Sequence, residues 1–197
     1  YFHQPNYYTI DGKPVFMIYD VPRLVSGLGG IESAREAIAW FREECVRSGL
    51  PGLHLQFTMW NEKCTNLSGV DGVKTVSAKE FGGVGFDSCS HYQFVHFLNI
   101  DRSYEELLPE VEAEWKRLES EFDFPYFPHV SVGWDNNPRF NDFRPGVMKN
   151  CTPENIERAL RMARDYADRH PEQPPLITVN SWNEWTESSY LEPDDLH

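Results

Sequence analysis

The chain has 197 residues, 40% of them hydrophobic, which is enough to bury one core of ordinary size. Its 31 acidic residues outnumber 18 Lys and Arg, and the formal net charge of −13 argues against a nucleic-acid backbone or an anionic membrane as the partner. The sequence contains no run of about 18 apolar residues, so we expect no membrane insertion. The four cysteines lack metal-binding or redox spacing, and we expect neither a metal nor another cofactor.

The first half of the chain alternates apolar strands with helices. A buried strand is predicted at Val15–Tyr19. Apolar residues then recur every three or four positions over 31–48, which predicts an amphipathic helix that ends at Gly49. Leu53–Met59 predicts a second strand, and a short third strand is expected within Gly82–Asp87.

The second half continues the alternation with a longer helix. Tyr104–Phe122 has helical periodicity but contains Pro109, so this helix either begins nearer Leu108 or bends at the proline. Three further elements are predicted: a strand at Phe127–Gly133, a helix opened by Thr152-Pro153, and a fifth strand at Pro175–Ser181.

This order of elements predicts an α/β fold in which helices cover a parallel sheet. Chemically active side chains at the predicted strand ends favour a (β/α)₈ TIM barrel, which builds its site at the carboxyl ends of its strands. Those residues are Tyr19-Asp20, Trp60-Asn61-Glu62, Asp87, Trp134-Asp135-Asn136 and Asn183-Glu184. Five strands do not close such a barrel. We therefore expect residues 1–197 to form a single domain covering about the last five strands, with the amino-terminal part of the same barrel as its partner.

A pair of carboxylates near the end of the chain carries the predicted chemistry. Cleavage of a glycosidic bond needs one carboxyl group as acid and another as base or nucleophile, and Glu184 and Glu187 are the candidates. Residues three apart share a face only in a tight turn or a 3₁₀ segment, so the last strand is expected to end near Asn183. The alternative is that both glutamates are simply solvated in a terminal loop.

Four segments, in order, resemble motifs of WbsX-type proteins, the glycoside hydrolase family 99-like group. The most specific of them runs from Thr178 to Asp194 and contains Glu184-Trp185-Thr186-Glu187. The other three are Asp11–Phe16 with Ile18-Tyr19-Asp20, Gly85-Phe86-Asp87, and Gly133–Arg139. Members of family 99 are retaining endo-α-mannosidases and α-mannanases on a (β/α)₈ barrel. The resemblance therefore implies an α-mannoside-like glycan as substrate.

The resemblance also implies roles for the two glutamates. Glu184 would be the base that deprotonates the sugar 2-hydroxyl, whose oxygen then attacks the anomeric carbon to give a 1,2-anhydro intermediate. Glu187 would be the general acid, and afterwards the base that activates water. Ser188 departs from the family pattern, which has glycine after the second glutamate, and this puts the local loop geometry in question.

Several aromatic and polar residues are candidates for contacts with the sugar, because pyranose C–H faces stack on rings and hydroxyls need directional partners. They are Tyr19, Trp60, Asp87, Trp134, Asp135, Asn183 and Trp185. For each one, core packing or a structural hydrogen bond is the competing interpretation. Arg139 is interpreted as a structural ion pair or as a contact for a charged substrate.

Two other functions stay open. One is a glycosyltransferase of surface-polysaccharide biosynthesis, the activity often attached to WbsX-type proteins, and the other is a non-catalytic carbohydrate-binding remnant. We expect a soluble protein, with a periplasmic or extracellular setting favoured over the cytoplasm.

Overall fold

The computed structural model describes residues 1–59 and 83–195. By internal contacts the chain divides into two compact units, one formed by Tyr1–Ser90 with Leu118–Tyr126 and the other by His91–Arg117 with Phe127–His197. The single domain expected from the sequence stays a prediction. Both units combine strands with helices, so the α/β class is confirmed.

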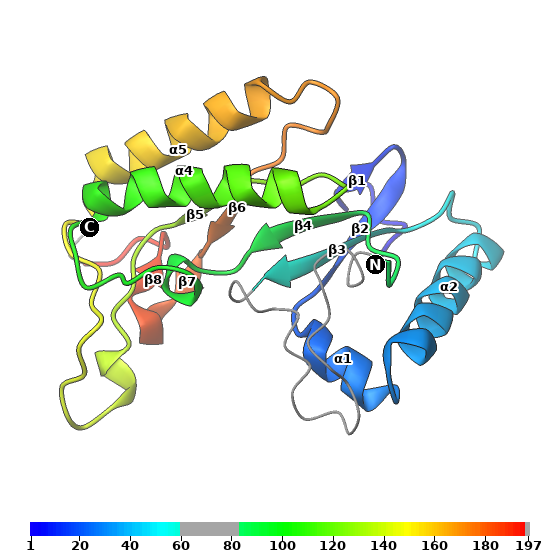
Figure 1. Cartoon of the computed structure of the whole chain (residues 1–197), viewed down its shortest axis with the longest axis horizontal. Coiled ribbons are helices and arrows are strands. Elements are labelled where there is room, and N and C mark those ends of the chain that lie inside the picture. Colours follow the sequence, from blue (N-terminus) through cyan, green and yellow to red (C-terminus); the bar gives the residue numbers. More distant parts are fainter. Residues whose placement is uncertain (60–82, 196–197) are drawn as a thin grey trace. The chain divides into compact units, whose positions relative to one another are not determined.

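The sheet of the first unit has the order β1-β2-β3-β4 among the described residues (Figure 1). Strands β1 (Thr9–Ile10) and β2 (Lys13–Ile18) are antiparallel, and β2 runs parallel to β3 (His54–Met59) with Val15 opposite His54. Strand β4 (Ser88–His91) follows β3 in the sheet. The two strands predicted at 15–19 and 53–59 are thus confirmed in place.

Among the described residues, two α-helices lie entirely within this unit. Helix α2 (Ile31–Arg47) buries Ala34, Ile38 and Cys45 on one face, as its periodicity predicts. Helix α1 (Val21–Gly27) was not predicted, and it begins because Asp20 Oδ1 accepts a hydrogen bond from the N–H of Arg23 at 2.9 Å. Asp20 is therefore the N-cap of a helix.

The core of the first unit centres on β3, whose six residues are all buried. The ring of Phe57 lies 5.0 Å from Phe86, 5.7 Å from Phe122 and 5.9 Å from Phe124, measured between centroids. Aromatic clusters of this kind bury large apolar areas and contribute roughly 1.5–3 kcal/mol per fully buried side chain. This cluster fixes β3 against the residues that directly follow helix α4 (Tyr104–Glu121).

Two predictions about strands in this unit are wrong. The strand at Val15–Tyr19 was expected to be buried, but Phe16 is 38% and Met17 48% exposed because the described residues leave much of β2 uncovered. The third strand is Ser88–His91 and does not lie within 82–87. Residues 83–85 form a turn in which Gly85 has φ +113°, a conformation suited to glycine that breaks the strand.

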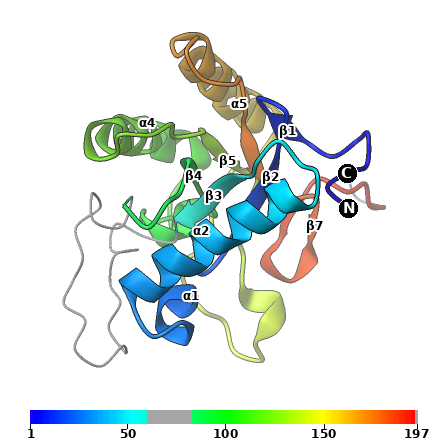
Figure 2. The ribbon, with the colours of Figure 1, turned by 90° about the vertical axis from the view of Figure 1, so that its right-hand side faces the viewer.

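The second unit contains the parallel pair β5 (His129–Ser131) and β6 (Thr178–Asn180), with His129 opposite Thr178. Helix α5 (Pro153–Asp168) packs on β5 and begins where Thr152 Oγ1 accepts from the N–H of Asn155, as its Thr-Pro signature predicts. Both strands lie within the predicted segments but are shorter. Helices α4 and α5 lie side by side in Figures 1 and 2.

Helix α4 (Tyr104–Glu121) passes through both units and contains Pro109. The alternative start near Leu108 is therefore wrong. The carboxylate of Glu106 reaches back to the N–H of Ser103, an N-terminal capping contact that supports the earlier start. In the second unit, the buried ring of Trp115 packs edge-on against Tyr166 of α5 at 5.5 Å between centroids.

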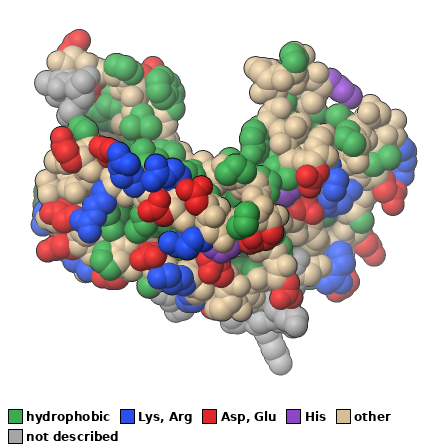
Figure 3. Space-filling view, turned by 90° about the horizontal axis from the view of Figure 1, so that it is seen from above, with side chains coloured by type: hydrophobic (Ala, Val, Ile, Leu, Met, Phe, Trp, Pro, Cys, Tyr) green, Lys and Arg blue, Asp and Glu red, His purple; other side chains and the backbone are tan. Residues whose placement is uncertain are grey.

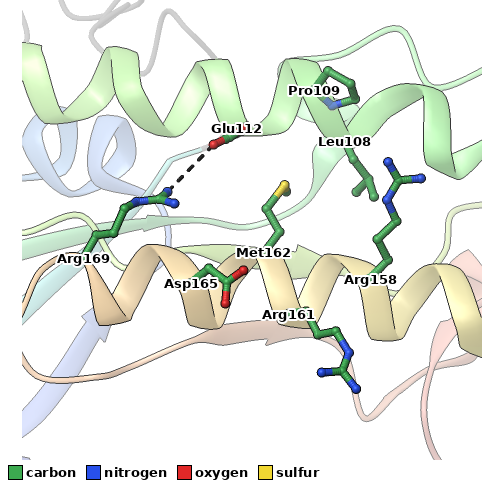
Figure 4. A pocket seen from close by; sticks show the side chains of 8 residues that line it. All are labelled: Leu108, Pro109, Glu112, Arg158, Arg161, Met162, Asp165 and Arg169. Carbon is green, nitrogen blue, oxygen red and sulfur yellow. Dashed lines mark ion pairs between the residues drawn. The ribbon is translucent and has the colours of Figure 1, made fainter.

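A groove separates the outer surfaces of α4 and α5 (Figure 4). Leu108, Pro109 and Glu112 line one wall; the other wall is formed by Arg158, Arg161, Met162, Asp165 and Arg169. Glu112 Oε1 lies 3.8 Å from Arg169 Nη2 across it, while Arg161 pairs with Glu157 on its own helix.

Basic and acidic side chains are likewise interspersed on the face drawn in Figure 3. No helix in the described ranges is long and apolar enough to cross a bilayer.

Candidate active site

The two predicted catalytic glutamates lie on a small hairpin that follows β6. Strand β7 (Asn183–Glu184) pairs antiparallel with β8 (Ser189–Tyr190), and a 3₁₀ helix, η3 (Trp185–Glu187), joins them. The 3₁₀ turn that the sequence required between the glutamates is present. Strand β6 ends earlier than predicted, at Asn180, because the chain then turns into the separate hairpin.

Arg139 joins the two carboxylates. Its Nη1 lies 2.9 Å from Glu187 Oε1, and its Nη2 lies 3.3 Å from Glu184 Oε1. Its Nε donates to Thr186 Oγ1 at 2.9 Å, and the Thr186 hydroxyl donates in turn to Glu184 Oε1 at 2.6 Å. One guanidinium therefore contacts every side chain with a carboxylate or hydroxyl on the turn from 184 to 187.

The two glutamates have different surroundings. Glu187 is 5% exposed, and its Oε2 has no hydrogen-bond partner among the described residues. Burial raises the pKa of Glu187 above its ordinary value; the nearby Arg139 opposes this rise, and the negative charge of Glu184 adds to it. The Glu184 side chain is 34% exposed. A buried carboxyl with a raised pKa beside a more solvated one is the arrangement that divides acid and base roles.

A buried hydrogen-bond network connects the hairpin to the end of β6. Gln93 Nε2 donates to Asn180 Oδ1 at 2.6 Å and to Ser189 Oγ at 2.7 Å, linking the end of β6 to β8. Ser181 Oγ donates to the carbonyl oxygen of Ser189 at 2.7 Å and accepts from the N–H of Glu184 at 3.1 Å. These four hydrogen bonds favour one geometry of the hairpin, because breaking any of them would leave a further buried polar group unpaired beside Gln93 Oε1, which has no partner among the described residues.

The segment after β5 is hydrogen-bonded to the same turn through its backbone. The N–H of Asp135 donates to the carbonyl oxygen of Glu187 at 2.8 Å. A Cβ atom placed on Gly133 would lie only 2.6 Å from the carbonyl oxygen of Ser188, so glycine is required for this close approach. Ser188 has φ +49°, the left-handed conformation for which the family pattern has glycine.

Other predicted sugar contacts lie on these two segments. Asp135 Oδ1 accepts from both the N–H and the side-chain amide of Asn137, so Asp135 shapes the loop that carries Arg139. Trp134 is half-buried, with its ring 6.3 Å from that of His96. Asn183 is exposed, and Trp185 is 43% exposed and stacks on Tyr190 at 4.1 Å.

The remaining predicted contacts belong to the first unit or lie outside the described residues. Tyr19 is 44% exposed at the end of β2. Asp87 precedes β4, so the strand-end position predicted for it is wrong; its Oδ2 accepts from Arg42 Nη2 at 2.6 Å and from the N–H of Leu55 at 2.7 Å. Trp60 falls outside the described residues. A sugar contact stays a prediction for all three.

Sequence reasoning missed the residues that hold the pair in place. Gln93 carries no motif signal, since its role depends on partners far along the chain, and Thr186 stood within the quoted Glu184–Glu187 motif but was given no role there. Arg139 stood in a motif that was quoted, yet its partners, 45 and 48 positions away, were not foreseen. Where the structure is described, no group of three or more His, Cys, Asp or Glu side chains is placed to hold a metal ion.

Comparison with solved structures gives the fold. The GH99 endo-α-mannosidase of Bacteroides thetaiotaomicron superposes with a TM-score of 0.61 at 17% identity, and the match covers 98% of this chain and 48% of that one. The same enzyme in complex with Bis-Tris-propane gives 0.60 at 16% identity, covering 97% and 50%. The chain is thus similar in fold to about half of that enzyme.

Comparison with curated sequences gives the uncharacterized protein WxcX of Xanthomonas campestris pv. campestris. One strain's protein is 23% identical over an alignment of 212 positions that covers 98% of this chain and 26% of that protein, and a second strain's is 22% identical. The chain therefore spans about a quarter of the length of these relatives. The family model described as glycosyltransferase WbsX matches residues 1–197. The chain belongs to the WbsX glycosyltransferase family.

Proposed function

We propose that this chain carries the catalytic carboxylates of a retaining glycoside hydrolase that acts on α-mannoside-like linkages of a polysaccharide or glycan. The observation that carries the proposal is the meeting of Glu184 and Glu187 at one guanidinium, with only Glu187 deeply buried. Two carboxylates whose oxygens contact neighbouring nitrogens of one guanidinium lie close together. Retaining enzymes need their carboxyl groups only about 5 Å apart.

In the first step Glu184 takes the proton of the sugar 2-hydroxyl, and that oxygen bonds to the anomeric carbon. The bond from this carbon to the leaving oxygen breaks, and Glu187 gives that oxygen its proton. In the second step Glu187 takes a proton from water, whose oxygen bonds to the anomeric carbon. The three-membered ring opens, and the 2-oxygen recovers its proton from Glu184. The raised pKa of Glu187 supports its assignment as the acid.

The exposed rings beside the pair support a sugar ligand. Trp182 is 60% and Trp185 43% exposed on the hairpin that carries both glutamates. An apolar ring that is left accessible next to carboxylates suits a pyranose, which offers a C–H face for stacking and hydroxyls for hydrogen bonds. We therefore propose Trp134, Asp135, Asn183 and Trp185, which lie in the same unit as the two glutamates, as contacts with the glycan.

The family description favours a second function, glycosyl transfer. Two carboxylates of this kind could serve transfer from a nucleotide sugar, with the nucleoside diphosphate as the leaving group of the first step and a sugar hydroxyl in place of water in the second. A carbohydrate-binding protein without turnover is the third alternative. The three functions are told apart by whether a product forms and whether its formation needs a nucleotide-sugar donor.

The test uses the protein in its full length, incubated with α-mannans and with oligomannosides, with and without nucleotide-sugar donors. Hydrolysis predicts released oligosaccharide without a donor, and NMR of the first product should show the α anomer that retention requires. Product that appears only with a nucleotide-sugar donor would support transfer. Binding of mannan without any product under either condition would support the binding protein and contradict the hydrolase.

A further inference from the structure

The loop that follows β5 places Arg139 in contact with both glutamates. A 3₁₀ turn, η2 (Asn137–Arg139), sits at its start. The side chain of Asn137 closes the loop, since its Nδ2 donates to the carbonyl oxygen of Arg144 at 3.0 Å and its Oδ1 accepts from the N–H of Arg144 at 2.6 Å. Asp135 fixes the other side of the turn through Asn137. The position of Arg139 is therefore held by both flanks of its loop.

We propose that Arg139 is the positioning residue of the carboxylate pair, holding Glu184 and Glu187 together through one guanidinium and thereby setting the pH range in which the pair works. This inference rests on the proposed function for the reaction, and on the geometry alone for the charge contact. Arg139 touches both groups through different nitrogens and reaches the intervening Thr186 with its third. Planar, forked donation of this kind is what a lysine cannot reproduce.

Among the charged groups near Glu187, Arg139 is the one that lowers its pKa. Arg139 faces it from the β5–α5 loop, and Glu184 faces it from β7. Asp135 contacts the Glu187 segment through its backbone, while its carboxylate is turned to Asn137. Within the described part of the chain, Arg139 is the cation that forms an ion pair with Glu187. Without Arg139, burial and the neighbouring carboxylate of Glu184 would raise the pKa of Glu187 with no cation to oppose them.

A purely structural ion pair between two loops is the competing interpretation. In either case the pKa of Glu187 rises when the arginine is removed, because the stabilising cation has gone. The structural ion pair predicts a loss of stability with kcat unchanged in the folded protein. The positioning role predicts in addition that kcat falls and that the rise in the pKa of Glu187 is seen in catalysis. The same change would move the alkaline limb of the kcat/KM profile to higher pH, since the acid must be protonated to act.

The experiment compares Arg139→Gln and Arg139→Lys with the native full-length protein. Arg144→Gln is the matched control, because this arginine lies in the same loop but stacks on the ring of Phe140, with its Cζ 3.7 Å from the centroid. Carboxyl titrations are followed by NMR with ¹³C-labelled glutamate, and Glu187 is assigned by its disappearance in Glu187→Gln. Arg139→Met, which keeps the aliphatic stem, replaces Arg139→Gln should that variant fail to fold.

We expect the pKa of Glu187 to rise by about one unit or more in Arg139→Gln, by less in Arg139→Lys, and not in Arg144→Gln. We expect kcat to fall about 10- to 100-fold with little change in KM, and lysine to restore part of it. An unchanged Glu187 titration in folded Arg139→Gln or Arg139→Met would overturn the inference. If the titration shifts but the native protein cleaves no mannoside, the proposed hydrolase fails while the charge contact stands.

Discussion

Gly133→Ala tests the fit between the segment after β5 and the hairpin that carries Glu184 and Glu187. The added methyl carbon would lie 2.6 Å from the carbonyl oxygen of Ser188, whereas ordinary contacts begin near 3.4 Å. Neither partner can rotate away, because both the Cβ of residue 133 and the Ser188 oxygen are fixed by the backbone. The two segments must therefore separate by several tenths of an ångström. No positive φ is involved at Gly133, so the effect reports on space alone.

The expected magnitude follows from this overlap. Forcing an extra methyl group into a packed interior costs typically 1–3 kcal/mol in the free energy of unfolding. Ser188 directly follows Glu187, the proposed acid, and displacing a catalytic carboxyl by a fraction of an ångström to 1 Å can reduce kcat by up to about 100-fold. We thus expect a loss of activity that exceeds what the loss of stability explains at 25 °C.

Urea unfolding and mannoside hydrolysis would be measured on the same preparations. Gly27→Ala is the matched control, because no atom lies within 4 Å of a Cβ placed there and α1 ends at this residue. Alanine in place of this helical glycine should leave activity unchanged and stabilise by up to about 1 kcal/mol. Native stability and native kcat in Gly133→Ala would refute the proposed contact between the two segments.

Three further predictions concern conformation, an ion pair and pH. Ser188→Gly removes the roughly 1–2 kcal/mol cost of a left-handed serine but gives the unfolded chain more conformational freedom. Urea unfolding should therefore show a gain of up to about 1 kcal/mol in the free energy of unfolding, with activity kept. A clear loss of stability would contradict the assignment of strain. Asp87→Asn should lower unfolding free energy by about 1–3 kcal/mol through its contact with Arg42, and no measurable loss would contradict a structural role. Burial lowers the pKa of His129 well below 6.5 and that of His96 to about 4, so that below pH 6.5 the unfolded state binds protons more readily than the folded state. The free energy of unfolding should therefore fall as the pH drops from about 6.5 towards 4. An unfolding free energy that stays constant in that window would contradict neutral buried histidines.

Local signals predicted the helices well. The three- and four-residue spacing of apolar residues over 31–48 gave α2, and the Thr152-Pro153 cap gave the start of α5. Both depend on neighbours within one or two turns. Helix α1 was missed because its signal is a single capping aspartate, Asp20, which also fits the end of a strand.

Strand prediction failed where tertiary contacts outweigh composition. Strand β4 reads Ser-Cys-Ser-His, which has little β propensity, and it is fixed by its place beside β3. The glycine-rich stretch before it looked like the strand but holds a turn at Gly85. Exposure of β2 depends on which elements cover it, and that information is not local.

The site was predictable in its residue types but not in its assembly. The spacing of Glu184 and Glu187 required a 3₁₀ turn, and the turn is there. Their meeting with Arg139, however, depends on how the β5 loop docks on the hairpin, which no spacing rule reveals. Gln93 illustrates the same limit, because its partner Asn180 lies 87 positions away.

Acid catalysis by Glu187 is the central claim, and Glu187→Gln in the full-length protein tests it most directly. The amide keeps the shape but cannot give up a proton, so release of oligosaccharide from α-mannan should fall at least about 100-fold while mannan binding is retained. Glu172→Gln is the control, because Glu172 is exposed and precedes β6 at the end opposite the hairpin. Hydrolysis by Glu187→Gln at the rate of the native protein would contradict the claim.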